Sequence, residues 1–480
     1  MSRVTRRGFL KGSLAMAGAT FAISGTKSSG QIIGANDTIH VGVAGFHGQG
    51  GSHISALVGM KEVKIIYLID PDSSLFAGKV KFVEEKGGNT PKCVQDIRKA
   101  LEDKDLDAIT TAPPNHWHSL ITIWSCQAGK DVYVEKPLSH NVHEGRIAVE
   151  TARKYNRMVQ HGTQNRSSME WARIAEIAKK GTYGKLLISR GLCYKPRGSI
   201  GFKEPKQPPA SLDFNMWLGP APDQPYHENL VHYNWHWFWD FGNGDIGNQG
   251  VHQMDIARWM IPGATLPKSV ISVGGRFGYS DQGQTPNSQI AVLDYGETQL
   301  VFEVRGLKTD GYMGEKVGNI LHFEEGTIAG DKFYRKGSDK PEDLPKIEAK
   351  LGPGKGKFEN WIAAMRSRNY KDLNADVLDA HLSCVPIHVA NISYRLGEDA
   401  PFNPKTKAFG DNKDAYETLA RMEEHLTKNG VKLEDVKLRV GKRLTFDPAT
   451  ERFTGDGADK ANEMLTRKYR APFVVPDKVA

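Results

Sequence analysis

Residues 38–53 read T-I-H-V-G-V-A-G-F-H-G-Q-G-G-S-H, and residues 64–70 read K-I-I-Y-L-I-D. The apolar pattern predicts a strand that ends at Gly45, a glycine-rich turn, a helix, and a second strand that ends at Asp70. This is the order of a dinucleotide-binding β-α-β unit, in which the helix N-terminus directs free N–H groups and a positive dipole at a diphosphate. Asp70 lies 20 residues after Gly50, where a carboxylate can accept hydrogen bonds from the adenosine ribose. We expect NAD rather than NADP, because no arginine closely follows Asp70 to accept a 2′-phosphate.

The turn departs from the G-x-G-x-x-G pattern at its second position. Read from Gly45, the pattern continues with His47 and Gly50, and Gly48 is an additional glycine. The second glycine normally lets a phosphate approach the backbone, so we expect His47 to shift the diphosphate or to cover it. The alternative interpretation is an ordinary tight turn in a parallel sheet.

Length and composition are those of a globular protein with two or three domains. The chain has 480 residues, of which 25% are charged and 39% hydrophobic. Much of its net charge of +8 comes from residues 1–36, which hold five basic residues and no acid, so the remainder gives no indication of nucleic-acid or anionic-membrane binding. The four cysteines are far apart and predict neither a zinc site nor a disulfide framework.

The N-terminus carries the pattern of a targeting signal. Residues 5–11 read T-R-R-G-F-L-K and precede a mild Ala- and Gly-rich apolar stretch at 14–23, which resembles a bacterial twin-arginine export signal. We expect residues 1–37 to be signal and linker, the twin-arginine translocation machinery to be a partner, and the mature protein to be periplasmic. The alternative is a basic N-terminal tail.

Strands and helices alternate through residues 38–162, at the spacing of a doubly wound parallel sheet. Ligands of such sheets bind beyond the carboxyl ends of the strands. Three polar clusters fall there: P-P-N-H at 113–116, E-K-P at 135–137 and T-Q-N-R at 163–166.

The E-K-P cluster after the strand D-V-Y-V, with A-P-P-N-H-W-H upstream, resembles the glucose–fructose oxidoreductase/inositol dehydrogenase/MocA family. The likeness covers residues 38–400 and is strongest with exported bacterial members. It implies an α/β fold: an N-terminal Rossmann domain at 38–162 and an α+β domain at 163–400 with a large, open, mostly antiparallel sheet. The resemblance also implies a homodimer or homotetramer formed through the open face of that sheet.

The resemblance places Lys136 beside the nicotinamide, hydrogen-bonded to the reacting hydroxyl, with Glu135 and Pro137 holding its loop. A cation at the end of a strand can steady a developing alkoxide, which agrees with that role. The alternative is a surface lysine. The cofactor contacts we predict are Gly45, His47, Gly48, Gln49, Gly50, Asp70, Pro113, Asn115, His118, Glu135, Lys136 and Gln164.

A second catalytic candidate lies in residues 242–255, G-N-G-D-I-G-N-Q-G-V-H-Q-M-D. The matching helix of the family carries an Asp and, four residues later, a His that takes the substrate proton. The His is His252 here, but the position four before it is Asn248, which can hydrogen-bond a hydroxyl but cannot accept a proton. Asp245 or Asp255 is expected to orient the imidazole instead. The alternative is a structural histidine at a helix N-terminus.

Residues 226–241 form the densest aromatic cluster of the chain, interleaved with histidines. Such rings either stack on sugar faces or pack a loop against the sheet, and the sequence leaves both open. His232 and His236 are four apart and could share a helix face, but a third ligand is missing, so no metal is predicted. The expected substrate contacts are Lys195, Arg197, Tyr233, His236, Asn248 and His252.

The rest of the chain completes the second domain and extends beyond it. Antiparallel strands are expected at 270–273, 289–293, 299–304 and 319–323, and helices at 358–366 and 375–396 that pack back on the first domain. Residues 401–480 hold an amphipathic helix at 414–429 and an apolar tail, A-P-F-V-V-P, which we expect to dock on the main body or on a neighbouring subunit.

Together these patterns predict an exported, NAD-dependent oxidoreductase that acts on a secondary hydroxyl of a sugar, glycoside or cyclitol. Lys136 and His252 are at the reacting centre, and the dinucleotide is expected to be tightly bound. One alternative is a glycoside hydrolase or lyase that works through transient oxidation and elimination. A second is a non-catalytic protein that binds the dinucleotide and a sugar.

Overall fold

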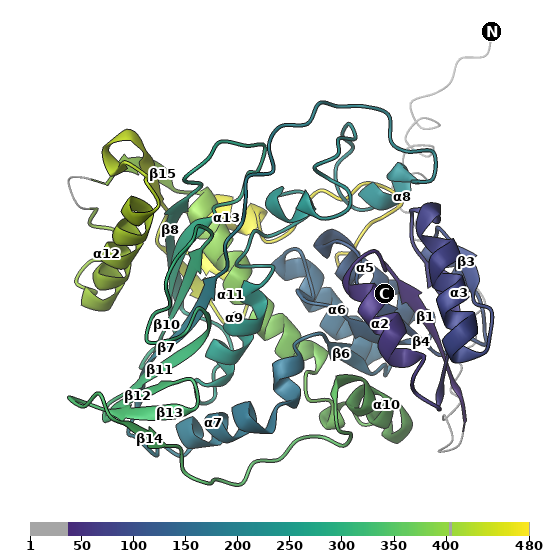
Figure 1. The fold of residues 1–480 in the computed structure, drawn as a ribbon, viewed down its shortest axis with the longest axis horizontal. Helices are drawn as coiled ribbons and strands as arrows, with labels where there is room; N and C mark the ends of the chain where they lie inside the picture. Colours follow the sequence, from purple (N-terminus) through teal and green to yellow (C-terminus); the bar gives the residue numbers. More distant parts are fainter. Residues whose placement is uncertain (1–36, 403–405, 480) are drawn as a thin grey trace, which may run out of the picture.

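The computed structural model describes residues 37–402 and 406–479, which form two sheets with helices between them (Figure 1). The expected export signal lies outside the described residues.

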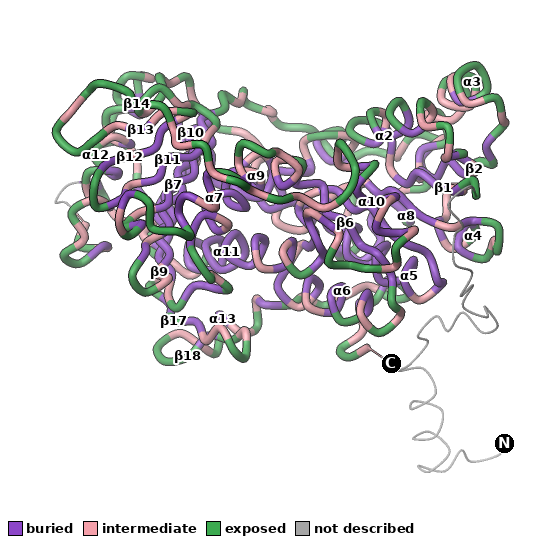
Figure 2. The backbone as a smooth tube through the Cα atoms, turned by 90° about the horizontal axis from the view of Figure 1, so that it is seen from below, coloured by how far each residue is buried: buried purple, intermediate pink, exposed green. Residues whose placement is uncertain are grey.

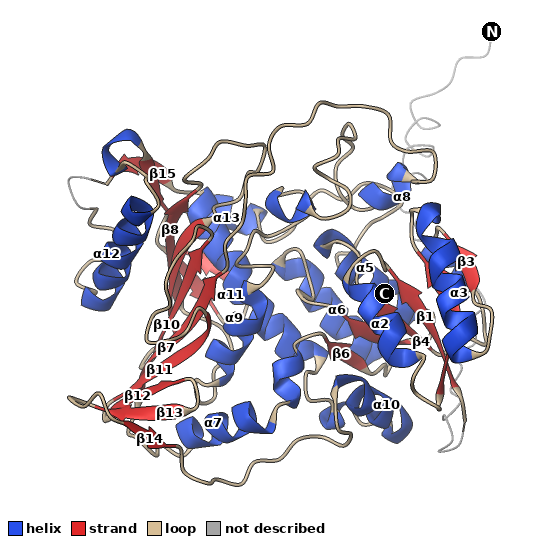
Figure 3. Ribbon diagram, in the orientation of Figure 1, coloured by secondary structure: helices blue, strands red, loops and turns tan. Residues whose placement is uncertain are grey.

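The N-terminal sheet is wholly parallel, with the strand order β3-β2-β1-β4-β5-β6. Both its faces carry helices, which is why its strands are continuous apolar runs (Figure 3). Its strands are β1 (Ile39–Ala44), β2 (Val63–Ile69), β3 (Lys92–Val94), β4 (Ala108–Thr111), β5 (Asp131–Val134) and β6 (Val159–His161). Its helices are α2 (Gln49–Leu57), α3 (Phe76–Gly87), α4 (Ile97–Leu101), α5 (Asn115–Gln127) and α6 (Val142–Lys154).

The second sheet has twelve strands and is antiparallel except for the central pair β7–β10. Its main path runs β14-β13-β12-β11-β7-β10-β9-β8-β16-β15; beside this path β17 pairs with β8, and β18 pairs with β17. Its strands are β7 (Leu186–Tyr194), β8 (Ser269–Gly275), β9 (Ser288–Asp294), β10 (Gln299–Arg305), β11 (Val317–Phe323), β12 (Gly326–Ala329), β13 (Lys332–Arg335), β14 (Pro341–Asp343), β15 (Glu398–Pro401), β16 (Lys437–Val440), β17 (Leu444–Asp447) and β18 (Arg452–Thr454). These two sheets confirm the predicted fold class.

Helices between the sheets bury the inner face of the large sheet (Figure 2). Residues 357–365 also pack on the first sheet, where Phe358 and Trp361 contact the ring of Tyr133. The helices of this part are α7 (Met169–Lys179), α8 (Phe214–Leu218), α9 (Gly250–Trp259), α10 (Lys357–Ser367), α11 (Val377–Arg395), α12 (Lys413–Lys428) and α13 (Ala458–Glu463).

Helix α12 covers part of the outer face of the large sheet, on the side away from α9 and α11 (Figure 1). Its Leu419, Met422 and Leu426 are buried in one cluster with residues of β8 and β9. Arg190, buried in β7, is bonded to Asp414 at 2.6 Å. The same chain therefore occupies part of the face that we expected to be open to a second subunit, and the oligomeric contact stays a prediction.

The C-terminal tail docks on the main body, along α5. Phe473 is 1% exposed, and its ring centroid lies 5.4 Å from that of Trp117 and 6.4 Å from that of Trp124.

Within the described residues, no helix is both long and apolar enough to cross a membrane.

Candidate functional site

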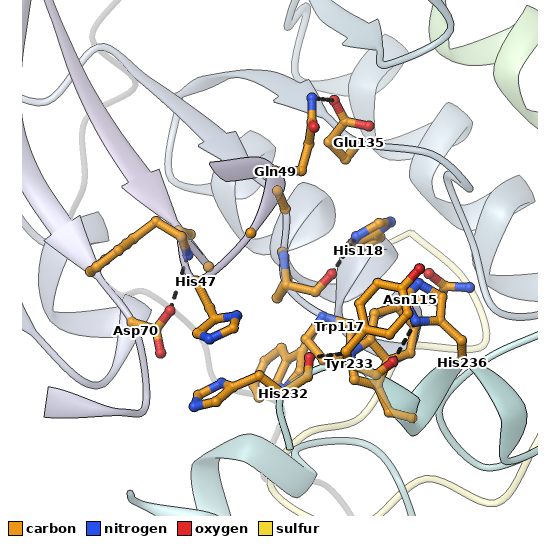
Figure 4. Close-up of a pocket in the computed structure, with 18 of the residues that line it drawn as sticks. His47, Gln49, Asp70, Asn115, Trp117, His118, Glu135, His232, Tyr233 and His236 are labelled. Atoms are coloured by element: carbon orange, nitrogen blue, oxygen red, sulfur yellow. Dashed lines mark hydrogen bonds between the residues drawn. The ribbon is translucent and has the colours of Figure 1, made fainter. Parts of the chain in front are cut away.

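A cleft of about 440 Å³ opens at the carboxyl ends of the parallel strands, between the glycine turn and the loops of the second domain. Every predicted cofactor and substrate residue except Gly50 lines it. Figure 4 shows His47 and Asp70 on one side of the cleft, and Asn115, His118 and His236 on the other. The structure thus brings together residues that are up to about 200 positions apart in the sequence.

The glycine turn has the shape that a diphosphate needs. Gly45 has a φ of 74°, a left-handed conformation, and a Cβ there would lie 2.5 Å from the backbone N of Pro113. A Cβ on Gly48, in contrast, would have no atom within 4 Å, so space lies open above the turn at the start of α2. An open cradle before a helix N-terminus fits the phosphates of a dinucleotide.

Gly50, a predicted cofactor contact, does not line the cleft. It lies under the turn, where a Cβ would be 2.0 Å from the carbonyl oxygen of Gly45. Its role is to let α2 pack directly against the turn, which is the function of the third glycine in the pattern.

We predict that Gly50→Ala weakens NAD binding about 10- to 100-fold, because overpacking costs about 1–3 kcal/mol and would push α2 away from the turn. Equilibrium dialysis with NAD measures the effect. Gly59→Ala is the matched control, since a Cβ there meets only the oxygen of Ala56 at 3.6 Å. Equal NAD affinity of the Gly50→Ala and Gly59→Ala variants would contradict the assignment.

Asp70 is 5% exposed at the end of β2 and holds the turn. Its carboxylate accepts hydrogen bonds from the backbone N–H groups of Phe46 and Asp72, both at 3.0 Å. Burial raises the pKa of Asp70 to about 6, and the two N–H donors offset part of the rise. The group is therefore ionised at neutral pH, as repulsion of a 2′-phosphate requires.

His47 spans the cleft rather than pointing away from it. Its ring stacks on that of His232 with centroids 4.1 Å apart and planes 4° apart, and the Nε2 of His232 lies 3.0 Å from Asp72 Oδ2 (Figure 4). The pair ties the glycine turn to the aromatic loop.

His232 and His236 do not share a helix face, since the short 3₁₀ helix covers only Asn234–Trp237. Among the described residues, no group of three or more His, Cys, Asp or Glu side chains could hold a metal ion.

The loop after β5 fixes Lys136. Glu135 accepts from the N–H of Lys136 at 3.2 Å, and its other oxygen lies 3.1 Å from His53 Nε2 and 4.0 Å from Lys357 Nζ. Burial acts to raise the pKa of Glu135, but His53, Lys357 and Lys136 together hold it well below its usual range. His118 joins this loop to the preceding one, since its ring nitrogens lie 2.5 Å from Pro137 O and 2.8 Å from Pro113 O.

The ammonium group of Lys136 reaches the second domain. It donates to the backbone and side-chain oxygens of Asn248, each at 3.2 Å. Burial lowers the pKa of Lys136, and the carboxylates of Glu135 and Asp245 offset part of that shift. The cation is held at the domain boundary, where both walls of the cleft can touch one substrate.

His252 lies in the first turns of α9 and lines the same cleft. Burial, together with the charge of Lys136, lowers its pKa to about 4, so the imidazole is neutral at pH 7. Its Nδ1 is buried and has no hydrogen-bond partner among the described residues.

The prediction that Asp245 or Asp255 orients His252 is wrong. Asp245 forms a two-point pair with Arg197, at 2.7 and 2.8 Å. Asp255 forms one with Arg166 at 2.8 and 2.9 Å. Arg166, which is buried, and Arg197, which is half-buried, pair with these two carboxylates, because an unpaired guanidinium away from water costs several kcal/mol.

The remaining substrate candidates surround this centre. Lys195 Nζ donates to Gln249 Oε1 at 3.2 Å, and Arg197 lies 3.4 Å from the hydroxyl of Tyr233. Tyr233 is 52% exposed, whereas His236 is buried, and burial lowers the pKa of His236 to about 3. Most rings of the aromatic loop are buried in one cluster, whereas Tyr233 lines the cleft, and stacking of a ring on a sugar stays a prediction.

Sequence reasoning missed part of the cleft wall. Residues 211–218 return to the first domain, where the N–H of Asp213 donates to Pro71 O at 2.8 Å. The local pattern of apolar residues cannot indicate that this segment contacts the first domain, because the two are far apart in the sequence. The missed lining residues include Gln95, Ile97, Trp117, Met216, Trp217, His232 and Gln249.

Two family models match the chain. Residues 39–163 match the NAD-binding Rossmann fold of an oxidoreductase family, and residues 197–426 match the C-terminal alpha/beta domain of the same family. Among curated proteins, the chain is 27% identical over 286 residues to a myo-inositol 2-dehydrogenase of Thermotoga maritima, covering 56% of this chain and 74% of that protein. It is also 25% identical over 171 residues to a glycosyl hydrolase family 109 protein of Shewanella pealeana. That alignment spans 34% of this chain and only 37% of the relative.

A solved structure with the same fold is the WlbA dehydrogenase from Bordetella pertussis, in complex with NADH and UDP-GlcNAcA. It has a TM-score of 0.55 at 16% identity, over 74% of this chain and 96% of that one. The two family models together span most of the chain, in the order and at the positions of the two sheets. The chain belongs to the glucose–fructose oxidoreductase/inositol dehydrogenase/MocA (Gfo/Idh/MocA) oxidoreductase family.

Proposed function

We propose that this protein is an NAD-dependent oxidoreductase that transfers hydride to or from a secondary hydroxyl of a sugar, glycoside or cyclitol. The observation that carries the proposal is the convergence of Lys136 and His252 in the cleft that begins at the glycine turn. The similar proteins support it, since they include a myo-inositol 2-dehydrogenase and the WlbA dehydrogenase in complex with NADH and UDP-GlcNAcA. When bound, NAD supplies the hydride acceptor, and the open turn and ionised Asp70 are the residues that would hold it.

The chain's own residues then handle the hydroxyl. Lys136 donates a hydrogen bond to the substrate oxygen and stabilises the negative charge that develops there. His252 is neutral and accepts the hydroxyl proton as the C–H bond is broken. Asn248 holds Lys136 through two oxygens and replaces the usual carboxylate without adding a charge. Substrate orientation by both domains brings the reacting atoms together.

A direct assay tests the proposal. Purified protein with NAD is exposed to sugars, glycosides and cyclitols, and reduction of the nicotinamide is followed by its absorbance. Reduction by at least one class of these hydroxyl compounds is expected. If the protein binds NAD but none of these compounds reduces the bound NAD, the protein is a binding protein, which is the second alternative.

The similarity to a glycosyl hydrolase family 109 protein favours one other candidate, hydrolysis or elimination after transient oxidation. Oxidation of a hydroxyl group to a carbonyl acidifies the C–H bond of the neighbouring carbon. A base in the cleft could then remove that proton, and elimination would expel an aglycone. A coloured glycoside separates the two functions. Aglycone release without net formation of NADH would identify the hydrolase or lyase, and NADH formation with the glycoside intact would identify the oxidoreductase.

The low pKa of His252 predicts an unusual pH profile. The deprotonated imidazole is the active base, so with substrate and cofactor saturating, kcat for oxidation should stay level as pH falls from about 8 to about 5. It should drop only near pH 4, where His252 becomes protonated. A fall centred near the ordinary histidine value of about 6.5 would contradict the buried environment of His252.

We also propose that the protein is exported with its cofactor already bound, which the twin-arginine pattern of residues 5–11 supports. Free NAD is scarce outside the cytoplasm, so a retained cofactor would be recycled in place. A reporter fused after residue 37 should lose export when Arg6 and Arg7 are both replaced by Lys. Unchanged export of that fusion would refute the assignment.

A further inference from the structure

The substrate half of the cleft is rich in cations and has no carboxylate free to bind a sugar. Of the described residues that line the cleft, only Asp70 and Glu135 are acidic. Asp70 is engaged by two backbone N–H groups, and Glu135 by His53 and Lys357. Neutral sugars offer hydroxyl donors that a free carboxylate would accept, and neither of these groups is available.

The cations of this half are Lys136, Lys195 and Arg197, and they are compensated unequally. Arg197 is neutralised by its two-point pair with Asp245. Lys136 has Glu135 as its neighbour in the chain. Lys195 forms no ion pair within the described residues, and its bond is to the neutral amide of Gln249.

The position of Lys195 is electrostatically unfavourable for the protein alone. Gln249 is the residue at the N-terminal cap of α9, and the partial positive charge of a helix N-terminus repels a cation by about 0.3–1 kcal/mol. Lys136 and Arg197 add their positive charges nearby, since the charges of Lys195 and Arg197 both act to lower the pKa of Lys136. An anion placed beside Lys195 would be stabilised by all of these groups.

Resting on the proposed function, we infer that the substrate is an anionic sugar, one that carries a carboxylate or phosphate group, and that Lys195 binds that group at the mouth of the cleft. Arg197 lies beside the same region, with its guanidinium stacked over Trp237 at 5.3 Å and held in place by Asp245. The anionic group is therefore held by the strand end of β7, while Lys136 and His252 meet the hydroxyl. Lys195 is a specificity residue, and the chemistry of hydride transfer does not depend on it.

Binding to the NADH-loaded protein tests the inference with matched ligands. Calorimetry compares D-glucose with D-glucuronate and glucose 6-phosphate, and D-galactose with D-galacturonate and galactose 6-phosphate. At least one anionic sugar should bind tenfold or more tightly than its neutral parent. A carboxylate preference and a phosphate preference each support the inference and tell the two kinds of anion apart.

Variants assign the preference to Lys195. Lys195→Gln should abolish it, and Lys195→Arg should retain most of it. Lys203→Gln is the matched control, because Lys203 pairs with Glu228 at 3.7 Å and does not line the cleft. The inference is overturned if no anionic sugar binds better than its neutral parent, or if the preference survives in Lys195→Gln.

Hydride transfer separates this inference from the proposed function. If the protein oxidises only neutral sugars, the inference of an anionic substrate is wrong, and the proposed oxidoreductase function is supported. Lys195-dependent binding of an anionic sugar without hydride transfer would support the binding site and overturn the oxidoreductase.

Discussion

Replacing Lys136 by Ala should lower the rate of hydride transfer about 10²- to 10³-fold and leave NAD bound. In the proposed mechanism the ammonium group stabilises charge on the reacting oxygen, and loss of one such donor in a dry site has effects of this size. The dinucleotide is expected to stay because the glycine turn and Asp70, on other loops, bind its diphosphate and ribose. Single-turnover reduction of bound NAD measures the rate, and equilibrium dialysis measures the binding.

Two further variants isolate the charge of Lys136. Lys136→Met keeps an apolar chain of similar length and should be as slow as the Ala variant. Lys180→Met alters an exposed lysine at the end of α7, outside the cleft, and should leave the rate unchanged. Near-normal turnover in either Lys136 variant would remove this residue from the reacting centre.

Phe473→Ala should destabilise the protein by about 3–5 kcal/mol, the cost of truncating a fully buried phenylalanine. The ring fills a site between Trp117 and Trp124, and the guanidinium of Arg470 lies 5.0 Å from its centroid. The cavity left behind would lie against Trp117, a residue that also lines the cleft. NAD binding should therefore weaken along with the fold, although Phe473 does not itself line the cleft.

Denaturant unfolding of the whole chain measures this change. Val474→Ala is the matched control, because its side chain is 44% exposed and should change stability by less than about 0.5 kcal/mol. A Phe473→Ala variant as stable as Val474→Ala would show that the tail does not pack on α5 in solution.

The first sheet could be predicted closely from the sequence, because each of its signals is local. Apolar runs, glycines and prolines predict the alternation of strands and helices through residues 38–162, and β1 and β2 end within one residue of their predicted ends at Gly45 and Asp70. The second sheet was predicted less completely. Four of its five longer strands, β8–β11, are predicted from their apolar residues, whereas β12–β18 are three or four residues long, too short for a clear apolar pattern.

The site divides in the same way. Gly45, Lys136 and His252 were found because each lies in a motif that reads along one stretch of chain. His232 was not placed correctly, because its partners His47 and Asp72 lie about 160 or more residues away. The partners of Asp245 and Asp255 were missed for the same reason, since arginines from other parts of the chain pair with both.

The turn after Gly45 is proposed to hold the diphosphate of NAD and so to direct the nicotinamide toward Lys136. A crystal structure of the protein soaked in NAD tests this most directly. We expect phosphate density against the backbone amides that follow Gly45, with the nicotinamide ring in contact with Lys136. A cleft that stays empty at saturating NAD, or that is filled by the protein's own side chains, would contradict it.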